Sequence, residues 1–280
     1  MTSLAGRAPG PDFSLSGRVA IITGGAGLLG LRHAEAIASV GGIPVLADIQ
    51  ADAAAARAAD VARACGVPAI GIACDITSGP SVAALLQTVR ETFCRVDILV
   101  NNAANNPKVE SSGTDFTRLE HFSVEQWDAD VAVGLTGAFL CAKIIGSALA
   151  AQGHGTIVNI SSEYGMLGPD QRLYEKEGVP AAEQAVKPVS YTVVKAGLHG
   201  LTLYLATYWA ASGVRTNTIT LGGVENAQPP EYTSRAATRD PLGRMALPHE
   251  FQGALVYLCS DASSFVTGAN LVVDGGKSVW

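Results

Sequence analysis

Short apolar runs rich in β-branched residues alternate along the chain with alanine-rich segments in which apolar residues recur every three or four positions. The longer segments, such as residues 31–40 and 80–93, have the period of amphipathic helices. The short runs predict strands at residues 18–23, 43–48, 68–74, 96–101, 155–161, 214–220 and 270–275. Because strand and helix alternate almost to the end of the chain, the pattern predicts an α/β fold with one doubly wound parallel sheet flanked by helices.

The organisation of the chain predicts one domain. A length of 280 residues fits a single large α/β domain, and the sequence contains no repeat, low-complexity tract or linker that would separate two. We expect a flexible leader at residues 1–15 and the domain at residues 16–280. A polar stretch at residues 169–188 is longer than the usual connection between a strand and a helix. Long loops at the carboxyl ends of parallel strands often carry specificity, so this stretch is the predicted substrate loop.

The composition excludes some classes of protein. Lys and Arg number 19 against 25 Asp and Glu, a net charge of -6, which argues against a protein that binds the phosphate backbone of nucleic acids. The five cysteines form no CxxC pair and the histidines show no metal-ligand spacing, so we expect a reduced, cytoplasmic protein without a metal site. Residues 131–151 are strongly apolar but contain Lys143, Gly134 and Gly137, which favours a buried or interface helix over a membrane span.

A glycine-rich turn follows the first predicted strand and precedes a predicted helix. Glycines at such a turn let a pyrophosphate approach the backbone and the N–H groups at the helix N-terminus. The alternative is a tight strand-to-helix turn without a ligand. The residues of this turn that we expect to contact a dinucleotide are Thr23, Gly24, Gly27, Leu28, Leu29 and Gly30.

Asp48 ends the second predicted strand, 18 residues after Gly30. This offset is close to the one at which a carboxylate accepts hydrogen bonds from the ribose hydroxyls of NAD. A 2′-phosphate on that ribose would be repelled by about 2 kcal/mol, even after solvent and salt have removed most of the interaction. Ile49 and Gln50, which follow, supply no compensating cation. The sequence therefore predicts NAD as the cofactor, the alternative being that Asp48 is only a solvated strand end.

Tyr191 and Lys195 are four residues apart in a predicted helix and therefore lie on one face of it. An ammonium about 5 Å from a phenol favours the phenolate by about 3 kcal/mol at an effective dielectric of about 20. We therefore expect Lys195 to lower the pKa of Tyr191, which would accept the proton of an alcohol during hydride removal. Ser162 ends a predicted strand and is placed to hydrogen-bond the substrate oxygen. The alternatives are a surface Tyr–Lys pair and a serine that bonds only local backbone.

The combined features resemble the short-chain dehydrogenase/reductase family of the classical type, which has a single Rossmann-type domain. The resemblance covers residues 14–277. It rests on the TGGAGLLG turn at 23–30, Asp48, Cys74–Ile76, NNAA at 101–104, NISS at 159–162, the YxxxK pair, Leu221–Gly223 and VDGG at 273–276.

The resemblance implies a role for each matching residue. It makes Tyr191 the general acid/base, while Lys195 lowers its pKa and binds the nicotinamide ribose, and Ser162 orients the substrate. Asp75 and Ile76 would flank the adenine. The remaining implied contacts with the cofactor are Ile49, Asn101, Asn102, Ala103, Ala104, Gly222 and Val224.

Three departures from the family pattern carry information. In the glycine-rich turn, Leu28 stands where the family usually has a glycine. Gly134 stands where the family has an asparagine that helps to hold a water for proton relay from the lysine to solvent, so another group or a water must substitute. Tyr191 follows Ser162 by 29 residues, a longer interval than the family has, and the excess is the polar stretch at 169–188.

The polar substrate loop suits a polyhydroxylated or charged substrate better than a steroid or an acyl chain. The alternative is a solvated insertion that does not touch the substrate. The segments SSEYG at 161–165, LYE at 173–175 and GGVENAQPP at 222–230 are similar to the branch of the family associated with flagellin modification and nonulosonic-acid sugars. The candidate substrate contacts are Glu163, Tyr164, Arg172 and Tyr174.

The sequence thus predicts an NAD-dependent oxidoreductase that acts on CH–OH groups and interconverts a secondary alcohol and a ketone, on a sugar or another polyhydroxylated small molecule. A polyol, gluconate-type or cyclic-alcohol dehydrogenase is the alternative among enzymes. A catalytically weak relative that binds NAD as a sensor or structural subunit is the alternative outside them. By the resemblance, we also expect a homo-oligomer, a dimer or tetramer, formed through helices at about residues 136–151 and 189–211.

Overall fold

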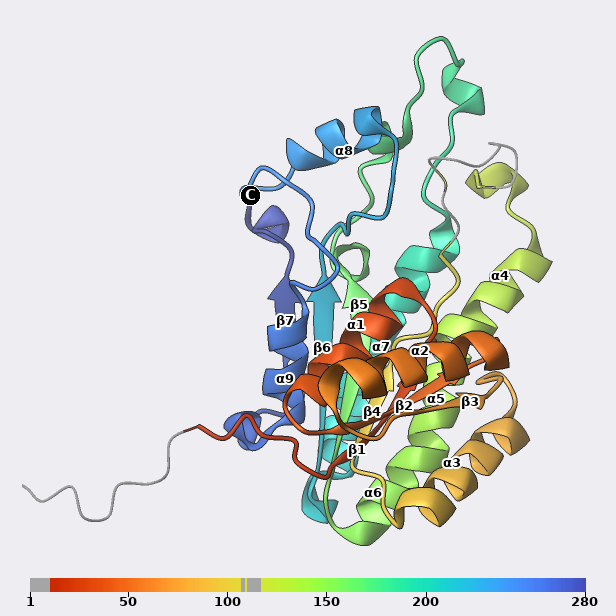
Figure 1. Ribbon diagram of the computed structural model, residues 1–280. Helices are drawn as coiled ribbons and strands as arrows, with labels where there is room; N and C mark the ends of the chain where they lie inside the picture. Colours follow the sequence, from red (N-terminus) through yellow and green to blue (C-terminus); the bar gives the residue numbers. More distant parts are fainter. Residues whose placement is uncertain (1–10, 107–108, 110–116) are drawn as a thin grey trace, which may run out of the picture.

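The chain folds around a parallel sheet of seven strands in the order β3-β2-β1-β4-β5-β6-β7 (Figure 1). The computed structural model describes residues 11–106, 109 and 117–280. The strands are β1 (Val19–Thr23), β2 (Ile43–Asp48), β3 (Ile70–Ala73), β4 (Ile98–Asn101), β5 (Gly155–Ser162), β6 (Val214–Leu221) and β7 (Asn270–Val273). Each coincides with one predicted run to within a few residues. The predicted α/β fold with a doubly wound parallel sheet is therefore confirmed.

Helices cover both faces of the sheet. They are α1 (Leu28–Ser39), α2 (Ala51–Cys65), α3 (Gly79–Phe93), α4 (Val124–Val131), α5 (Gly137–Cys141), α6 (Ser147–Gln152), α7 (Val189–Tyr208), α8 (Pro230–Ala237) and α9 (Gln252–Cys259). The π-helical turns Ala132–Thr136 and Ala142–Gly146 join α4, α5 and α6 into one helical stretch. Buried residues of α1, α2 and α9 share one core cluster, and those of α3, α5, α6 and α7 share the other.

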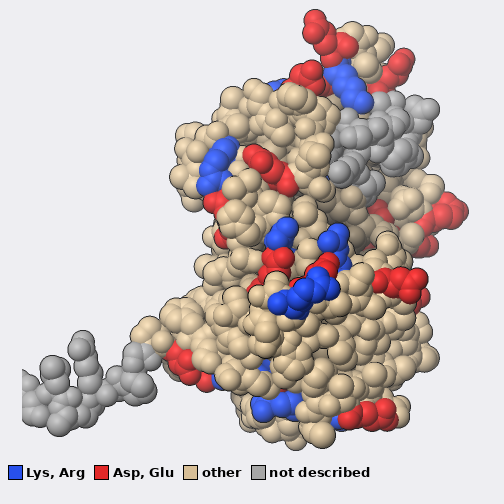
Figure 2. All heavy atoms as spheres, viewed as in Figure 1, with Lys and Arg blue, Asp and Glu red and all other residues tan. Residues whose placement is uncertain are grey.

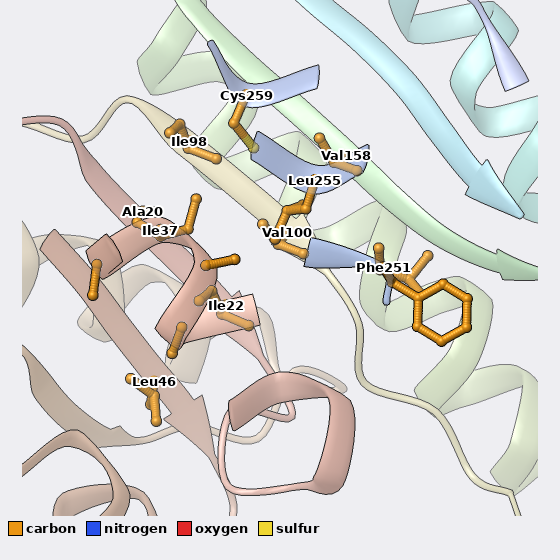
Figure 3. Packing of buried hydrophobic residues seen from close by; sticks show 14 of the residues in the cluster. Ala20, Ile22, Ile37, Leu46, Ile98, Val100, Val158, Phe251, Leu255 and Cys259 are labelled. Atoms are coloured by element: carbon orange, nitrogen blue, oxygen red, sulfur yellow. The ribbon is translucent and has the colours of Figure 1, made fainter. Parts of the chain in front are cut away.

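The two core clusters follow from the alternation of side chains along the strands. In β1, Ala20 and Ile22 belong to the cluster with α1 and α9, whereas Val19 and Ile21 belong to the opposite one. Figure 3 shows the first cluster, in which Phe251 and its neighbours on α9 approach the central strands. Because both faces are buried, every residue of β1 is apolar except its last, Thr23.

Two expectations about the rest of the chain need comment. Of the expected leader, residues 1–10 lie outside the described residues, but Leu15 is fully buried and donates its N–H to the carbonyl of Val40 at 2.9 Å. The packed fold therefore begins before residue 16, because Leu15 supplies apolar surface to the core. The stretch Val124–Gln152 is long and apolar enough to cross a membrane by length and composition, and 44% of its most apolar window is buried inside this fold.

The predicted substrate loop, residues 169–188, rises beyond the carboxyl ends of β5 and β6 beside α8 (Figure 1). It contains two short 3-10 turns, Gln171–Tyr174 and Ala181–Glu183. Arg235 ties α8 to the loop, because its guanidinium donates to the carbonyls of Arg172, at 3.2 Å, and Glu175, at 2.7 Å. Acidic side chains gather at this protruding end in Figure 2, where those of the loop are exposed.

Candidate active site

A cavity of about 510 Å³ lies at the carboxyl ends of the strands, where the sheet reverses its winding between β1 and β4. Most of the residues predicted from the sequence line it, although they come from segments far apart in the chain. These are Gly24, Gly27, Leu28, Leu29, Gly30, Asp48, Ile49, Asp75, Ile76, Asn102, Ala103, Ala104, Ser162, Glu163, Tyr164, Tyr174, Tyr191, Lys195, Gly222 and Val224. The structure thus brings the glycine-rich turn, the acidic strand end and the Ser–Tyr–Lys set into one cavity.

The glycine-rich turn has the shape that phosphate binding requires. Gly24 has φ +63, which side chains disfavour, and a Cβ at Gly30 would lie 2.2 Å from the carbonyl oxygen of Gly24. Gly27 is the N-cap of α1 and, among the described residues, no side chain caps the helix there. The N–H groups of the first turn of α1, which begins with Leu28, are therefore available to a phosphate at the cavity wall.

Asp48 serves both the turn and the cavity. Its Oδ2 accepts the N–H of Ala26 at 3.0 Å, and its Oδ1 accepts the N–H of Gln50 at 3.0 Å. Each carboxylate oxygen keeps a lone pair, and the half-buried side chain lines the cavity. A dinucleotide with an unphosphorylated ribose fits these groups. Its ribose hydroxyls can donate to the Asp48 carboxylate, and its pyrophosphate can accept from the N–H groups of the turn.

Three of the residues expected to contact a ligand do not line the cavity. The hydroxyl of Thr23 is buried and accepts the N–H groups of Asn102, at 3.0 Å, and Ala103, at 3.1 Å, so Thr23 positions that loop. Asn101 is buried and donates to Asn159 Oδ1 within the sheet. Arg172 is exposed and its guanidinium pairs with Asp170, because the loop turns this side chain outward and its neighbour Tyr174 inward.

The end of β5 and the first turns of α7 hold Ser162, Tyr191 and Lys195 together. The Ser162 side chain hydrogen-bonds that of Tyr191. The Lys195 ammonium donates to the carbonyl of Ile160 at 2.8 Å, and the Ser161 hydroxyl donates to the carbonyl of Lys195 at 2.8 Å. These paired bonds fix the helix against the strand that carries Ser162.

The N-terminus of α7 is held by a second contact. The Ser190 hydroxyl donates to Asp130 Oδ2 of α4 at 2.5 Å, and both residues are buried. Asp130 also accepts from Gln126 Nε2 at 2.9 Å. The residue before Tyr191 is therefore anchored, which restricts the position of the tyrosine ring.

Burial dominates the electrostatics of the catalytic pair. It raises the pKa of Tyr191, against the hydrogen bond from Ser162. The pKa of Tyr191 is therefore raised overall, because desolvation of the phenolate is the largest influence on it, and the lowering effect expected of Lys195 stays a prediction. Burial, together with the charge of Lys187, lowers the pKa of Lys195 to about 8, so its ammonium is mostly retained at neutral pH.

The structure explains the glycine at position 134. A Cβ on Gly134 would lie 2.4 Å from Cγ1 of Val194, the residue that precedes Lys195. Gly134 is buried within the π-helical turn. The space beside Gly134 is thus filled by Val194, so no larger side chain fits there without a shift.

Lys187 is the principal site residue that the sequence did not single out. Its ammonium lies 4.0 Å from the centroid of the Tyr191 ring and donates to Asn106 Oδ1 at 2.6 Å. Its position was a usable signal, because Lys187 precedes Pro188, the N-cap of the helix that carries Tyr191 in its first turn. Tyr232 of α8 also lines the cavity, but only the contact between α8 and the substrate loop reveals it.

Comparisons with known proteins agree with this geometry. A family model described as enoyl-(acyl carrier protein) reductase matches residues 28–278. D-threitol dehydrogenase of Mycolicibacterium smegmatis is 33% identical over 273 residues, which are 96% of this chain and 95% of the relative. Cis-4-hydroxycyclohexanecarboxylate dehydrogenase of Sinomonas cyclohexanicum is 35% identical over 267 residues, 92% of this chain and 96% of the relative.

Solved structures show the same fold with either nicotinamide cofactor. An NAD+-bound xylitol dehydrogenase has a TM-score of 0.81 at 26% identity, covering 94% of this chain and 99% of that one. A gluconate 5-dehydrogenase from Burkholderia cenocepacia in complex with NADP and tartrate has a TM-score of 0.82 at 28% identity, covering 96% and 98%.

Proposed function

The chain belongs to the short-chain dehydrogenase/reductase family, and we propose that it is an NAD-dependent enzyme that interconverts a secondary alcohol and a ketone on a small polyhydroxylated substrate. One observation carries the proposal. Tyr191, bonded to Ser162 and flanked by two lysines, opens into the cavity whose other end holds Asp48 and the glycine-rich turn.

The residues of the site divide the chemistry between them. The glycine-rich turn and Asp48 would hold NAD, which would supply the hydride acceptor for the carbinol carbon. Tyr191 accepts the hydroxyl proton during oxidation and returns it during reduction. The Ser162 hydroxyl hydrogen-bonds the substrate oxygen as its charge changes, and the Lys195 ammonium favours the phenolate. Lys195, which lines the same cavity, would also hold the nicotinamide ribose, as the family resemblance implies.

Asp48 is the reason for proposing NAD rather than NADP. Its carboxylate lines the ribose end of the cavity and is held in place by the N–H groups of Ala26 and Gln50. An additional phosphate there would meet a fixed negative charge. Both cofactors occur among similar structures, so the proposal depends on this residue.

The polar substrate end supports a polyhydroxylated substrate. Glu163, Tyr164, Tyr174 and Tyr232 line it, and all four carry groups that bond hydroxyls. Similar enzymes are named for D-threitol, xylitol and gluconate. Because segments of this chain also resemble the nonulosonic-acid branch, we include sugars of that type among the candidate substrates.

An NAD+ reduction screen over polyols, sugars, sugar acids and cyclic alcohols tests the function. We expect turnover with at least one of these classes and at least tenfold lower kcat/KM with NADP+. Replacing Tyr191 by Phe should abolish turnover and leave the affinity for NAD+ nearly unchanged. Tight NAD+ binding without turnover of any alcohol would instead favour a sensor or structural subunit.

We also propose that the protein is a cytoplasmic homo-oligomer. Several large apolar side chains of α7 are exposed in the single chain, among them Leu203 (59%), Tyr204 (62%) and Tyr208 (63%), and Tyr204 stacks on Tyr208. Exposed apolar surface of this kind on one helix favours burial against a second copy. The molar mass in solution measures the state, with a monomer at micromolar concentration as the contrary result.

A further inference from the structure

Glu163 is a buried acid at the substrate end of the cavity, directly after Ser162, and only 3% of it is exposed. Its Oε1 accepts from the ammonium of Lys277 at 2.5 Å, and the Lys277 side chain is itself 12% exposed. Its Oε2 is buried and has no partner among the described residues. An acceptor left unbonded in this way is unfavourable, and Glu163 lines the cavity, so a ligand group that donates to this oxygen would stabilise the site.

Lys277 determines what kind of group that is. Burial raises the pKa of Glu163, and the ammonium of Lys277 opposes this effect. Asp240 and Asp274 also lie close enough to raise that pKa, so Glu163 and Lys277 form an ion pair in acidic surroundings, where Glu163 offers a strong acceptor. A hydroxyl can donate to that acceptor, whereas a carboxylate or phosphate would place a second acceptor against it.

The neighbouring side chains extend the same polar wall. The Tyr164 side chain hydrogen-bonds that of Tyr174, and Tyr174 hydrogen-bonds Tyr232. The ring of Tyr164 meets that of Tyr191 edge to face, with the centroids 6.4 Å apart. Glu163 thus follows Ser162 directly in the chain and lines the same cavity as these tyrosines.

The cations near Tyr191 do not change this conclusion. The ammonium of Lys187 contacts the Tyr191 ring and Asn106 Oδ1. Lys195 is buried and donates to the carbonyl of Ile160. Neither is bonded to Glu163 in the contacts that the structure gives for that residue, whose charge is met by Lys277.

We propose that Glu163 Oε2 accepts a hydrogen bond from a second substrate hydroxyl close to the reacting carbon. The enzyme then selects diols and polyols over mono-alcohols, and over analogues in which a carboxylate replaces that second hydroxyl. This inference rests on the proposed function, since it assumes that Ser162 and Tyr191 bind the reacting oxygen. It goes beyond that function because it assigns the substrate preference to one side chain and one ligand group.

Matched substrates and matched variants test the proposal. The substrates are 2,3-butanediol against 2-butanol, and 1,2-cyclohexanediol against both cyclohexanol and 2-hydroxycyclohexanecarboxylate, each with NAD+. The variant is Glu163→Leu combined with Lys277→Met, which removes both members of the ion pair. Glu125→Leu, a change at an exposed acid of α4, is the control.

We expect the wild type to oxidise each diol with a kcat/KM at least tenfold above that of the matched mono-alcohol and of the carboxylate. The double variant should lose at least tenfold on the diols and stay within about twofold on the mono-alcohols, as expected for one hydrogen bond to a charged group. Glu125→Leu should match the wild type. Thermal unfolding of all variants reports whether the fold is retained.

Several results would overturn the proposal. A wild type that treats diol and mono-alcohol alike, or that prefers the carboxylate, contradicts it without any variant and leaves the alcohol dehydrogenase function standing. A diol preference that survives in the folded double variant shows that another residue reads the hydroxyl. Turnover of no alcohol at all would overturn the proposed function, and this inference with it.

Discussion

The ammonium of Lys187 lies 4.0 Å from the centroid of the Tyr191 ring, and that of Lys195 lies 5.8 Å from it. A cation at the face of a phenol ring stabilises the phenolate more than the phenol, because the phenolate ring carries more negative charge. The two lysines therefore act against burial, which raises the pKa of Tyr191. Since a raised pKa leaves the tyrosine protonated at neutral pH, alcohol oxidation should rise with pH above neutrality, and ketone reduction should fall.

Replacing Lys187 by Met should move the acid limb of the oxidation profile to higher pH. Loss of the cation raises the pKa of Tyr191 further, so kcat/KM for oxidation at pH 7 should fall about tenfold and recover at alkaline pH. Lys187→Arg keeps a charge over the ring and should stay close to the wild type. A limb that does not move in Lys187→Met would show that this lysine has no effect on the proton acceptor.

Replacing Asp48 by Asn should weaken the discrimination between the cofactors. The amide removes the charge that repels a 2′-phosphate and keeps one oxygen for the N–H of Ala26. We expect the ratio of kcat/KM for NAD+ to that for NADP+ to fall about tenfold. Asp52→Asn, at an exposed position of α2, controls for net charge. An unchanged ratio would mean that another group sets the preference.

Replacing Gly134 by Asn should destabilise the fold by about 1–3 kcal/mol, because the new Cβ would meet Val194 Cγ1. Adding Val194→Ser removes that methyl group and should recover most of the loss. Gly253→Asn, at an exposed glycine of α9 with open space where the new Cβ would lie, should be close to neutral. Urea unfolding of the wild type, Gly134→Asn, Val194→Ser and the double variant measures the coupling, and strictly additive effects would contradict the steric explanation.

His33 should make stability depend on pH. It is fully buried, neither ring nitrogen has a partner among the described residues, and burial lowers its pKa to about 4. Between its unfolded value of 6.5 and about pH 4, the unfolded chain binds the proton and the folded chain does not, so stability falls as the pH falls through this range.

The size of the His33 effect follows from that difference in pKa. Between pH 7 and pH 5 the wild type should lose about 2 kcal/mol of unfolding free energy through this group. His33→Leu should remove that part of the loss, whereas His121→Leu, at an exposed histidine, should retain it. Urea unfolding at both pH values measures the unfolding free energy. An equal loss of that free energy between pH 7 and pH 5 in His33→Leu and the wild type would refute the assignment.

The fold could be predicted from the sequence more completely than the site, because strands and helices leave local patterns and loop contacts do not. Strands buried on both faces are continuous apolar runs, and β1 shows this without the structure. The spacing of Tyr191 and Lys195 is a local helical property, so it also survives in the sequence. The sequence pattern points to Arg172 as a site residue and passes over Lys187. The reason is that the substrate loop is held by Arg235, 63 residues after Arg172, and no local pattern reveals that contact.

Thr23 and Asn101 show a second limit. Both are polar residues at strand ends, where a side chain faces either the cavity or the interior according to the register of its strand. In this fold they bond other protein groups, Thr23 the loop after β4 and Asn101 the side chain of Asn159. Asp48 and Ser162 are also polar residues at strand ends, and they line the cavity. Sequence pattern alone does not separate the two cases.

The strand order has a consequence for how the protein acquires its structure during synthesis. The central strand β1 pairs with β2, which follows closely in the chain, but its other edge pairs with β4, where Ala20 lies opposite Ile98. That edge stays open until the ribosome has released β4, and the native contacts of the sheet are far apart along the chain. Folding should therefore be slow compared with a helical protein of similar size, and the nascent chain should depend on chaperones to keep that edge from pairing with another molecule.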